Sequence, residues 1–236
     1  MTNTAITMTA FKRTNYFKTV LNSIKNSMDY CRTYLPIYIS IDYYSEEIPT
    51  LVKSIDWTEI HMLINNPSVG CNQNTRNAIS YGLSIKDSVI HIEDDTVMSK
   101  DAIKFFVDML KMFHDDSSIV SVTGYNRTIS LDLDNKSDFS KIEQQNHFTC
   151  WGAAFWKHKA DILLDNWIQT CNKENSSISW DSHINDNIFI PNKLYQVKPM
   201  ISRIQNIGAE DGTWVPSAGW HYDNHRSPFT SDDLLS

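Results

Sequence analysis

The sequence predicts an α/β protein built on a mostly parallel sheet that is flanked by helices. Short apolar runs rich in β-branched residues alternate with longer segments that repeat apolar side chains at helical spacing, from residue 5 to about residue 122. Polar residues follow several of these runs directly, as at the carboxyl ends of parallel strands. The 236 residues contain no low-complexity linker, which favours a single domain over residues 1–236.

The first half of the chain repeats one unit of strand, polar loop and helix. Its strands are recognised by apolar alternation and its helices by apolar positions three or four residues apart. Ser99 is the expected N-cap of the fourth helix, and Asp101 suits the first turn of that helix. The expected elements are, in order, strand 5–9, helix 17–28, strand 37–41, helix 48–55, strand 60–64, helix 72–83, strand 89–92, helix 103–113 and strand 119–122.

The second half is less regular. Residues 130–146 are polar and predict a surface loop, whereas residues 148–156 are apolar and aromatic. A helix is expected at about 159–171 and a short strand at 194–197. The tail carries the aromatic residues Trp214, Trp220 and Tyr222 among Gly and Pro, which predicts a lid and not an independent core.

Three consecutive acids, Glu93, Asp94 and Asp95, follow the apolar strand 89–92. Adjacent carboxylates repel one another and are costly to bury, so they must face solvent or a cation. Oxygen ligands suit Mg²⁺ or Mn²⁺, which keep coordination positions open for phosphate. The alternative is an acidic turn in which Asp94 caps the next segment.

The position of these acids in the sheet favours a cation-binding site over a simple acidic turn. Parallel strands bring their carboxyl ends to one edge, so the loop 11–13, Asp42 and the acids 93–95 are expected to converge there. Ligands of open α/β sheets bind at this edge. The sequence therefore predicts a binding site assembled from distant loops.

Charge and cysteine content limit the partners. The net charge of −7 and the absence of a basic stripe argue against a nucleic-acid ligand. The four cysteines show no metal-site or redox spacing, which predicts reduced thiols and a cytoplasmic protein. No signal peptide or transmembrane run of about 18 apolar residues is recognised, although peripheral membrane contact stays open.

Four motifs together resemble a known family. They are the acidic segment 91–101 before an aromatic helix, Ser-Val-Thr-Gly-Tyr-Asn at 121–126, Trp-Gly-Ala at 151–153 and Trp180-Asp181. This set is similar to GT-A fold glycosyltransferases, closest to the N-acetylglucosaminyltransferase I group. The resemblance implies a nucleotide-sugar-binding half at 1–126 and an acceptor-side half with a C-terminal loop at 127–236.

The resemblance also implies a donor site. In the family the last acid of the triplet binds Mn²⁺ (or Mg²⁺) on the donor diphosphate, which matches Asp95, while Glu93 and Asp94 would hold ribose, sugar or metal-bound water. Arg13, or else Lys12, matches a basic residue near the phosphates, and Asp42 matches an acid that contacts the nucleobase. An exposed helix charge is an equal alternative for Arg76. The implied donor-binding set is completed by Thr9, Phe11, Asn74, Arg76 and the sugar platform Trp151 and Gly152.

The remaining implied roles concern catalysis and the tail. Asp181 matches the family's general base, with Asp186 as fallback and a helix N-cap as the simpler interpretation. A C-terminal histidine binds metal in many such enzymes, which points to His221, although His225 competes and a surface histidine is common. Arg203 is expected to pair with a core acid. Trp156 and Trp167 are assigned to packing.

The function implied is a metal-dependent inverting glycosyltransferase that moves a sugar from a nucleoside-diphosphate sugar to a glycan or glycolipid. A UDP-sugar such as UDP-GlcNAc is the favoured donor, and hexosyl or N-acetylhexosaminyl transfer is expected. A nucleotidyltransferase is the first alternative, but residues 9–15 lack the glycines that cradle a triphosphate. A non-catalytic sugar-binding relic is the second.

Overall fold

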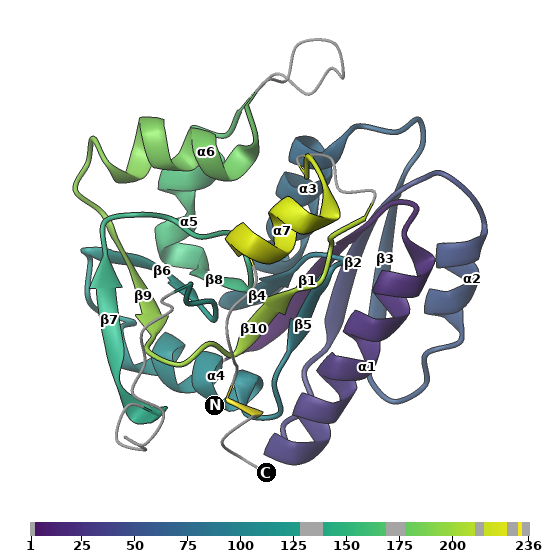
Figure 1. Ribbon diagram of the computed structural model, residues 1–236, viewed down its shortest axis with the longest axis horizontal. Helices are drawn as coiled ribbons and strands as arrows, with labels where there is room; N and C mark the ends of the chain where they lie inside the picture. The colour runs from purple at the N-terminus through teal and green to yellow at the C-terminus, as the bar shows by residue number, and fades with distance from the viewer. Residues whose placement is uncertain (1–2, 128–138, 169–177, 211–214, 226–230, 233–236) are drawn as a thin grey trace.

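The computed structural model describes residues 3–127, 139–168, 178–210, 215–225 and 231–232, and Figure 1 shows how its elements are arranged. A sheet of eight strands within these ranges forms the centre, in the order β3-β2-β1-β4-β8-β6-β9-β7. Its strands are β1 (Thr4–Ala10), β2 (Ile37–Asp42), β3 (Ile60–Asn65), β4 (Ser88–Ile92), β6 (Ile119–Thr123), β7 (Ile142–Gln145), β8 (Ala153–Trp156) and β9 (Tyr195–Pro199).

The helices and a small second sheet surround this centre. Strands β5 (Thr96–Met98) and β10 (Ile204–Asn206) pair antiparallel outside the main sheet. The helices are α1 (Thr14–Cys31), α2 (Glu47–Lys53), α3 (Cys71–Ile85), α4 (Ala102–Met112), α5 (Lys157–Leu164), α6 (Trp180–Ile184) with a π-helical turn at Asn185–Phe189, and α7 (Ala218–His225).

Strand directions confirm the mostly parallel α/β sheet. Strands β3, β2, β1 and β4 are parallel neighbours, whereas β8 runs antiparallel to both β4 and β6. Strand β1 has β2 on one side and β4 on the other, so the strand order reverses there. Such a reversal opens a crevice beyond the strand ends, and this crevice contains the candidate site.

Two hydrophobic cores cover opposite faces of the sheet. Along β4, Ile90 and Ile92 join the core that contains α1, α2 and α4, while Val89 joins the core of α3, α5 and α6. All three side chains are fully buried. The continuous apolar run of β4 follows from this two-sided burial, and the chain becomes polar where the strand leaves the core.

Three local expectations are corrected by the structure. The segment expected as the surface loop 130–146 contains edge strand β7, which pairs with β9; residues 128–138 lie outside the described ranges. The helix expected at 159–171 is α5 and ends at Leu164. The N-cap of α4 is Asp101 and not Ser99, whose hydroxyl donates to the Asp101 carboxylate over 3.1 Å.

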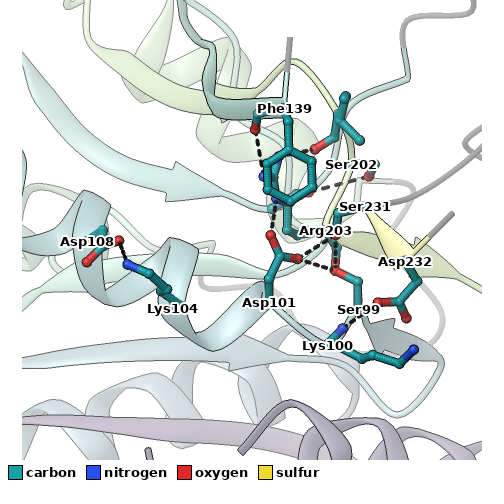
Figure 2. A network of polar contacts seen from close by, with 12 residues as sticks. Ser99, Lys100, Asp101, Lys104, Asp108, Phe139, Ser202, Arg203, Ser231 and Asp232 are labelled. Atoms are coloured by element: carbon teal, nitrogen blue, oxygen red, sulfur yellow. Dashed lines mark hydrogen bonds and ion pairs between the residues drawn. The ribbon is translucent and has the colours of Figure 1, made fainter. Parts of the chain in front are cut away.

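Arg203 has the structural role that was expected for it. Its Nε donates to Asp101 over 3.1 Å, and its Nη1 and Nη2 donate to the carbonyls of Ile201 and Phe139, as Figure 2 shows. Ser231 completes the network by bonding to the Ser99 hydroxyl over 2.7 Å. The buried ion pair joins the start of α4 to the chain that leads into β10, and so it fixes the segment beside the acids.

Candidate active site

The crevice beyond the carboxyl ends of β1, β2 and β4 has a volume of about 750 Å³. Residues from every expected donor loop line it, together with residues from the C-terminal half. Of the thirteen residues expected at the site, eleven line the crevice: Thr9, Phe11, Arg13, Asp42, Asn74, Glu93, Asp94, Asp95, Trp151, Asp181 and His221.

Arg13 is the nearest cation to the acid triplet. Its Nη1 lies 2.8 Å from Asp95 Oδ2, and its guanidinium also forms an ion pair with Asp94. The three side chains are only 17%, 12% and 9% exposed, in that order. Burial alone would lower the pKa of Arg13, but attraction to Asp95 and Asp94 outweighs burial and raises it. The arginine is therefore permanently charged within the crevice.

One arginine does not neutralise all the acids. Burial raises the pKa of Glu93 to about 8, and repulsion by Asp95, Asp181 and Asp94 adds to the shift. Burial also raises the pKa of Asp94 to about 6, against the opposing effect of Arg13. A proton therefore stays on Glu93 at neutral pH, and a second cation in the crevice would release it.

The end of β10 and the chain that follows it enclose Asp95 from the other side. Asn206 Nδ2 donates to Asp95 Oδ1 over 3.2 Å, and the Ile207 amide donates to the Asp95 carbonyl over 2.8 Å. A Cβ on Gly208 would lie 2.1 Å from Asp95 Oδ2, so any other residue here would displace the Asp95 carboxylate. Sequence reasoning did not identify Asn206 and Gly208, although the Asn-Ile-Gly run after Arg203 was the available signal.

Asp42 is held by the loop between β3 and α3. Its carboxylate accepts bonds from the Ser68 hydroxyl at 2.7 Å, the Val69 amide at 2.7 Å and the Gly70 amide at 3.0 Å. Gly70 has φ +83°, in the left-handed region that favours glycine. Asn74 is fixed nearby by Asn65, which donates to it over 2.9 Å. These bonds present an acid and an amide at the end of the crevice formed by β1 and β2.

Asp181 lies on the opposite wall, in the first turn of α6. The preceding Trp180 is 3% exposed, stacks on Trp167 at 5.2 Å and packs against Phe148. This aromatic packing fixes the helix that carries Asp181. Trp167 and Trp156 are both buried in the cores, as expected for packing residues. The fallback acid Asp186 is exposed and does not line the crevice.

Helix α7 places both candidate histidines at the crevice. His221 is 1% exposed; its Nε2 lies 3.3 Å from the Asn206 carbonyl, and its buried Nδ1 has no hydrogen-bond partner. His225 packs edge-on against Trp151 at 5.0 Å and lies 4.5 Å from Trp220. Figure 1 shows α7 near β10, which agrees with the contact between His221 and Asn206. Trp214, from the same aromatic tail, lies outside the described residues.

Two expected site residues lie elsewhere. Arg76 donates to the Leu164 carbonyl over 3.2 Å, at the end of α5, and does not line the crevice. Gly152 has φ +59°, and a Cβ at this position would lie 2.6 Å from the Ile204 side chain and 3.3 Å from Phe106, so glycine is required here by the fold next to Trp151. Arg76 lies on the expected helix, but its position along that helix did not reveal the direction in which its side chain points.

The residues present fit a cation that is bound jointly with a diphosphate. Among the described residues, no group of three or more His, Cys, Asp or Glu side chains is close enough to hold a metal ion alone. Asp95 supplies a carboxylate, and His221 has an unpartnered ring nitrogen. Phosphate oxygens and water would fill the other positions of Mn²⁺ or Mg²⁺. The free thiols of Cys31, Cys71 and Cys150 are not used in such a site.

In the part of the chain that the structure describes, no helix is both long and apolar enough to cross a membrane.

No protein-family model and no curated protein sequence matches the chain. Solved structures do resemble it.

TarS of S. aureus superposes with a TM-score of 0.53 and 12% identity over 76% of this chain and 32% of TarS. TarS 1–349 in complex with UDP superposes with a TM-score of 0.51 and 13% sequence identity, over 83% of this chain and 60% of the TarS fragment. The mannosyltransferase PcManGT from Pyrobaculum calidifontis, in complex with GDP-Man and Mn²⁺, superposes with a TM-score of 0.53 and 14% sequence identity. The match covers 78% of this chain and 50% of PcManGT. The chain thus spans between 32% and 60% of the length of these proteins. The narrower N-acetylglucosaminyltransferase I likeness stays a prediction, whereas the expected fold is confirmed: the chain has the GT-A fold of glycosyltransferases.

Proposed function

We propose that the protein is a metal-dependent inverting glycosyltransferase that uses a nucleoside-diphosphate sugar, with UDP-GlcNAc or a related UDP-sugar as donor. The observation that carries the proposal is the convergence of Asp42, the acids 93–95 and Asp181 on one crevice of a GT-A fold. Neighbouring structures contain UDP in one case and GDP-Man with Mn²⁺ in another. A glycosyltransferase needs these groups together, because the cation stabilises the diphosphate that leaves the anomeric carbon while the base activates the hydroxyl that attacks the same carbon.

Donor binding follows from the two ends of the crevice. Asp42 and Asn74, with Thr9 and Phe11, are proposed to contact the base and ribose, while Arg13 contacts the diphosphate. Arg13 is held at the acids, so its permanent positive charge lies beside the carboxylates that would hold the metal ion of the diphosphate. Residues 1–126 therefore form the proposed donor half.

Asp95 and His221 would hold Mn²⁺ or Mg²⁺. Such an ion supplies charge neutralisation for the departing diphosphate. Glu93 and Asp94 would lie near this ion, and the raised pKa of Glu93 makes it the acid that gives up a proton as positive charge enters. Gly208 and Asn206 keep the Asp95 carboxylate in place.

Asp181 is the proposed general base. Its carboxylate takes the proton of the acceptor hydroxyl, whose oxygen forms a bond to the anomeric carbon as the bond from that carbon to the diphosphate breaks. Attack from the side opposite the leaving group inverts the anomeric centre. The acceptor, a glycan or glycolipid, would lie over Trp151, where an aromatic face can stack on sugar C–H groups. Residues 127–236 then form the acceptor side.

The proposal is tested with Asp95→Ala. Mn²⁺-dependent release of UDP from UDP-GlcNAc, or from the nucleotide sugar that gives the largest Mn²⁺-dependent thermal shift, is expected to fall at least about 100-fold. Asp108→Ala removes an exposed acid of α4, outside the crevice, and is the matched control. Full metal-dependent activity of Asp95→Ala, or pyrophosphate release from a nucleoside triphosphate by the wild type, contradicts the proposal.

A further inference from the structure

Helix α6, which carries the proposed base Asp181, is capped by a residue from another helix. Its own N-cap residue, Ser179, makes no side-chain bond to the free backbone amides of the first turn. Asn72 of α3 supplies that bond instead, because its Oδ1 accepts from the Trp180 amide over 3.1 Å. Its Nδ2 donates to the Ile178 carbonyl over 3.3 Å. One amide side chain thus holds the backbone on both sides of Ser179.

Asn72 is itself rigidly placed. It is 5% exposed, and its backbone carbonyl accepts from Trp167 Nε1 over 3.0 Å. Trp167 stacks on Trp180, so backbone, side chain and indole rings form one connected unit. Asn185 secures the other side, since its Nδ2 donates to the Asp181 carbonyl over 3.2 Å. The backbone of Asp181 is therefore fixed from two directions.

The same asparagine is connected to the donor end of the crevice. Asn72 follows the loop whose Val69 and Gly70 amides bind the Asp42 carboxylate. It also lines the crevice between that loop and Asp181. Movement of α3 relative to α6 would change the distance between donor and base, and the two bonds of Asn72 oppose this movement.

We infer that Asn72 is a positioning residue that sets the location of the Asp181 carboxylate relative to the bound donor. This inference rests on the proposed function, in which Asp181 deprotonates the acceptor. Asn72 takes no proton and binds no reacting atom; it acts through the start of α6. A base displaced by about 1 Å loses on the order of 100-fold in rate. Loss of Asn72 should therefore lower kcat and leave donor binding unchanged.

The test compares Asn72→Ala with Gln73→Ala, a change at the next position of α3, whose side chain bonds to Asn77 and to no other residue within the described ranges. Mn²⁺-dependent release of UDP from UDP-GlcNAc gives kcat and KM, calorimetry gives the affinity for UDP with Mn²⁺, and thermal unfolding reports folding. For Asn72→Ala we expect kcat to fall roughly 10- to 100-fold, while KM and UDP affinity stay within about threefold. Gln73→Ala is expected to match the wild type.

A second variant covers the case in which Asn72→Ala does not fold. Asn72→Asp keeps an acceptor for the Trp180 amide but loses the N–H that donates to the Ile178 carbonyl, so its kcat is expected to fall about 3- to 10-fold with UDP affinity retained, and a kcat equal to that of the wild type would overturn the inference. An unchanged kcat in folded Asn72→Ala, or equal losses in kcat and UDP affinity, overturns the inference. Failure of the wild type to bind UDP with Mn²⁺ would instead reject the proposed function.

Discussion

Replacing Arg13 by glutamine tests whether a guanidinium holds the acid cluster together in the free protein. The change keeps a polar side chain but removes the charge that lies 2.8 Å from Asp95 and is also paired with Asp94. Glu93, Asp94 and Asp95 then face one another without a cation. The consequence is a direct loss of folding stability, separate from any effect on catalysis.

The size of the loss follows from the geometry. Two unit charges with centres about 4 Å apart attract by about 4 kcal/mol at an effective dielectric constant of about 20. Arg13 makes two such pairs, but its own desolvation offsets part of the gain. Removing one partner of a buried pair costs about 3–5 kcal/mol, and we expect about 3 kcal/mol for Arg13→Gln near neutral pH.

Urea denaturation of both proteins, at about pH 7.5 and about pH 5, measures this loss. The deficit should shrink at the lower pH because Asp94, whose pKa is raised to about 6, then gains a proton and repels Asp95 less, whereas Glu93, whose pKa is raised to about 8, is mostly protonated at both pH values. It should also shrink with Mn²⁺, which can take the place of the guanidinium, so Mn²⁺ alone should stabilise Arg13→Gln more than the wild type.

Lys12→Gln is the matched control, because it removes the same charge from the adjacent crevice residue, for which no ion pair with these acids is found among the described residues. It should change stability by less than about 1 kcal/mol. Equal stability of Arg13→Gln and wild type near neutral pH, or a deficit that grows on acidification, refutes the reasoning.

Three further outcomes are expected. Gly208→Ala places a Cβ 2.1 Å from Asp95 Oδ2 and should weaken Mn²⁺-dependent UDP binding at least about tenfold by calorimetry; unchanged affinity would show that the carboxylate moves freely. Because the pKa of Glu93 is raised, the folded state keeps a proton that the unfolded chain loses above about pH 4.5, so metal-free stability should fall as pH rises towards 8. Glu93→Gln should flatten that urea-denaturation profile, and an identical slope would exclude Glu93 as its source. Arg203→Met leaves Asp101 buried without its cation and should cost about 3–5 kcal/mol in urea denaturation, whereas a loss below about 1 kcal/mol would contradict the role of this pair.

Local pattern was sufficient for the first half of the fold. Apolar alternation in β2 and the helical spacing in α1 and α4 are properties of short windows, and the structure has those elements within a few residues of their expected bounds. The acidic triplet was equally clear, since three carboxylates after a buried strand need a partner wherever the strand lies. Parallel connectivity then predicted that Asp42 and the triplet would share one edge.

The second half depended on contacts that short windows do not contain. Strand β8 inserts antiparallel between β4 and β6, and β7 pairs at the far edge within a segment expected to be a loop. These pairings join residues far apart in sequence, so their stability comes from neighbours that periodicity does not identify. The Arg76 side chain points to Leu164 and not into the crevice, and this direction is likewise set by contacts between distant segments.

The sequence by itself determined the α/β class, the edge of the sheet at which the candidate site lies and the acids placed there, because these follow from periodicity and charge within short segments. Only the tertiary structure decided which groups restrain those acids: Arg13 between Asp94 and Asp95, Gly208 against Asp95, and Asn72 at the start of the helix that carries Asp181. Each of these is a contact between distant segments, and its geometry exists only once both hydrophobic cores have packed against the sheet.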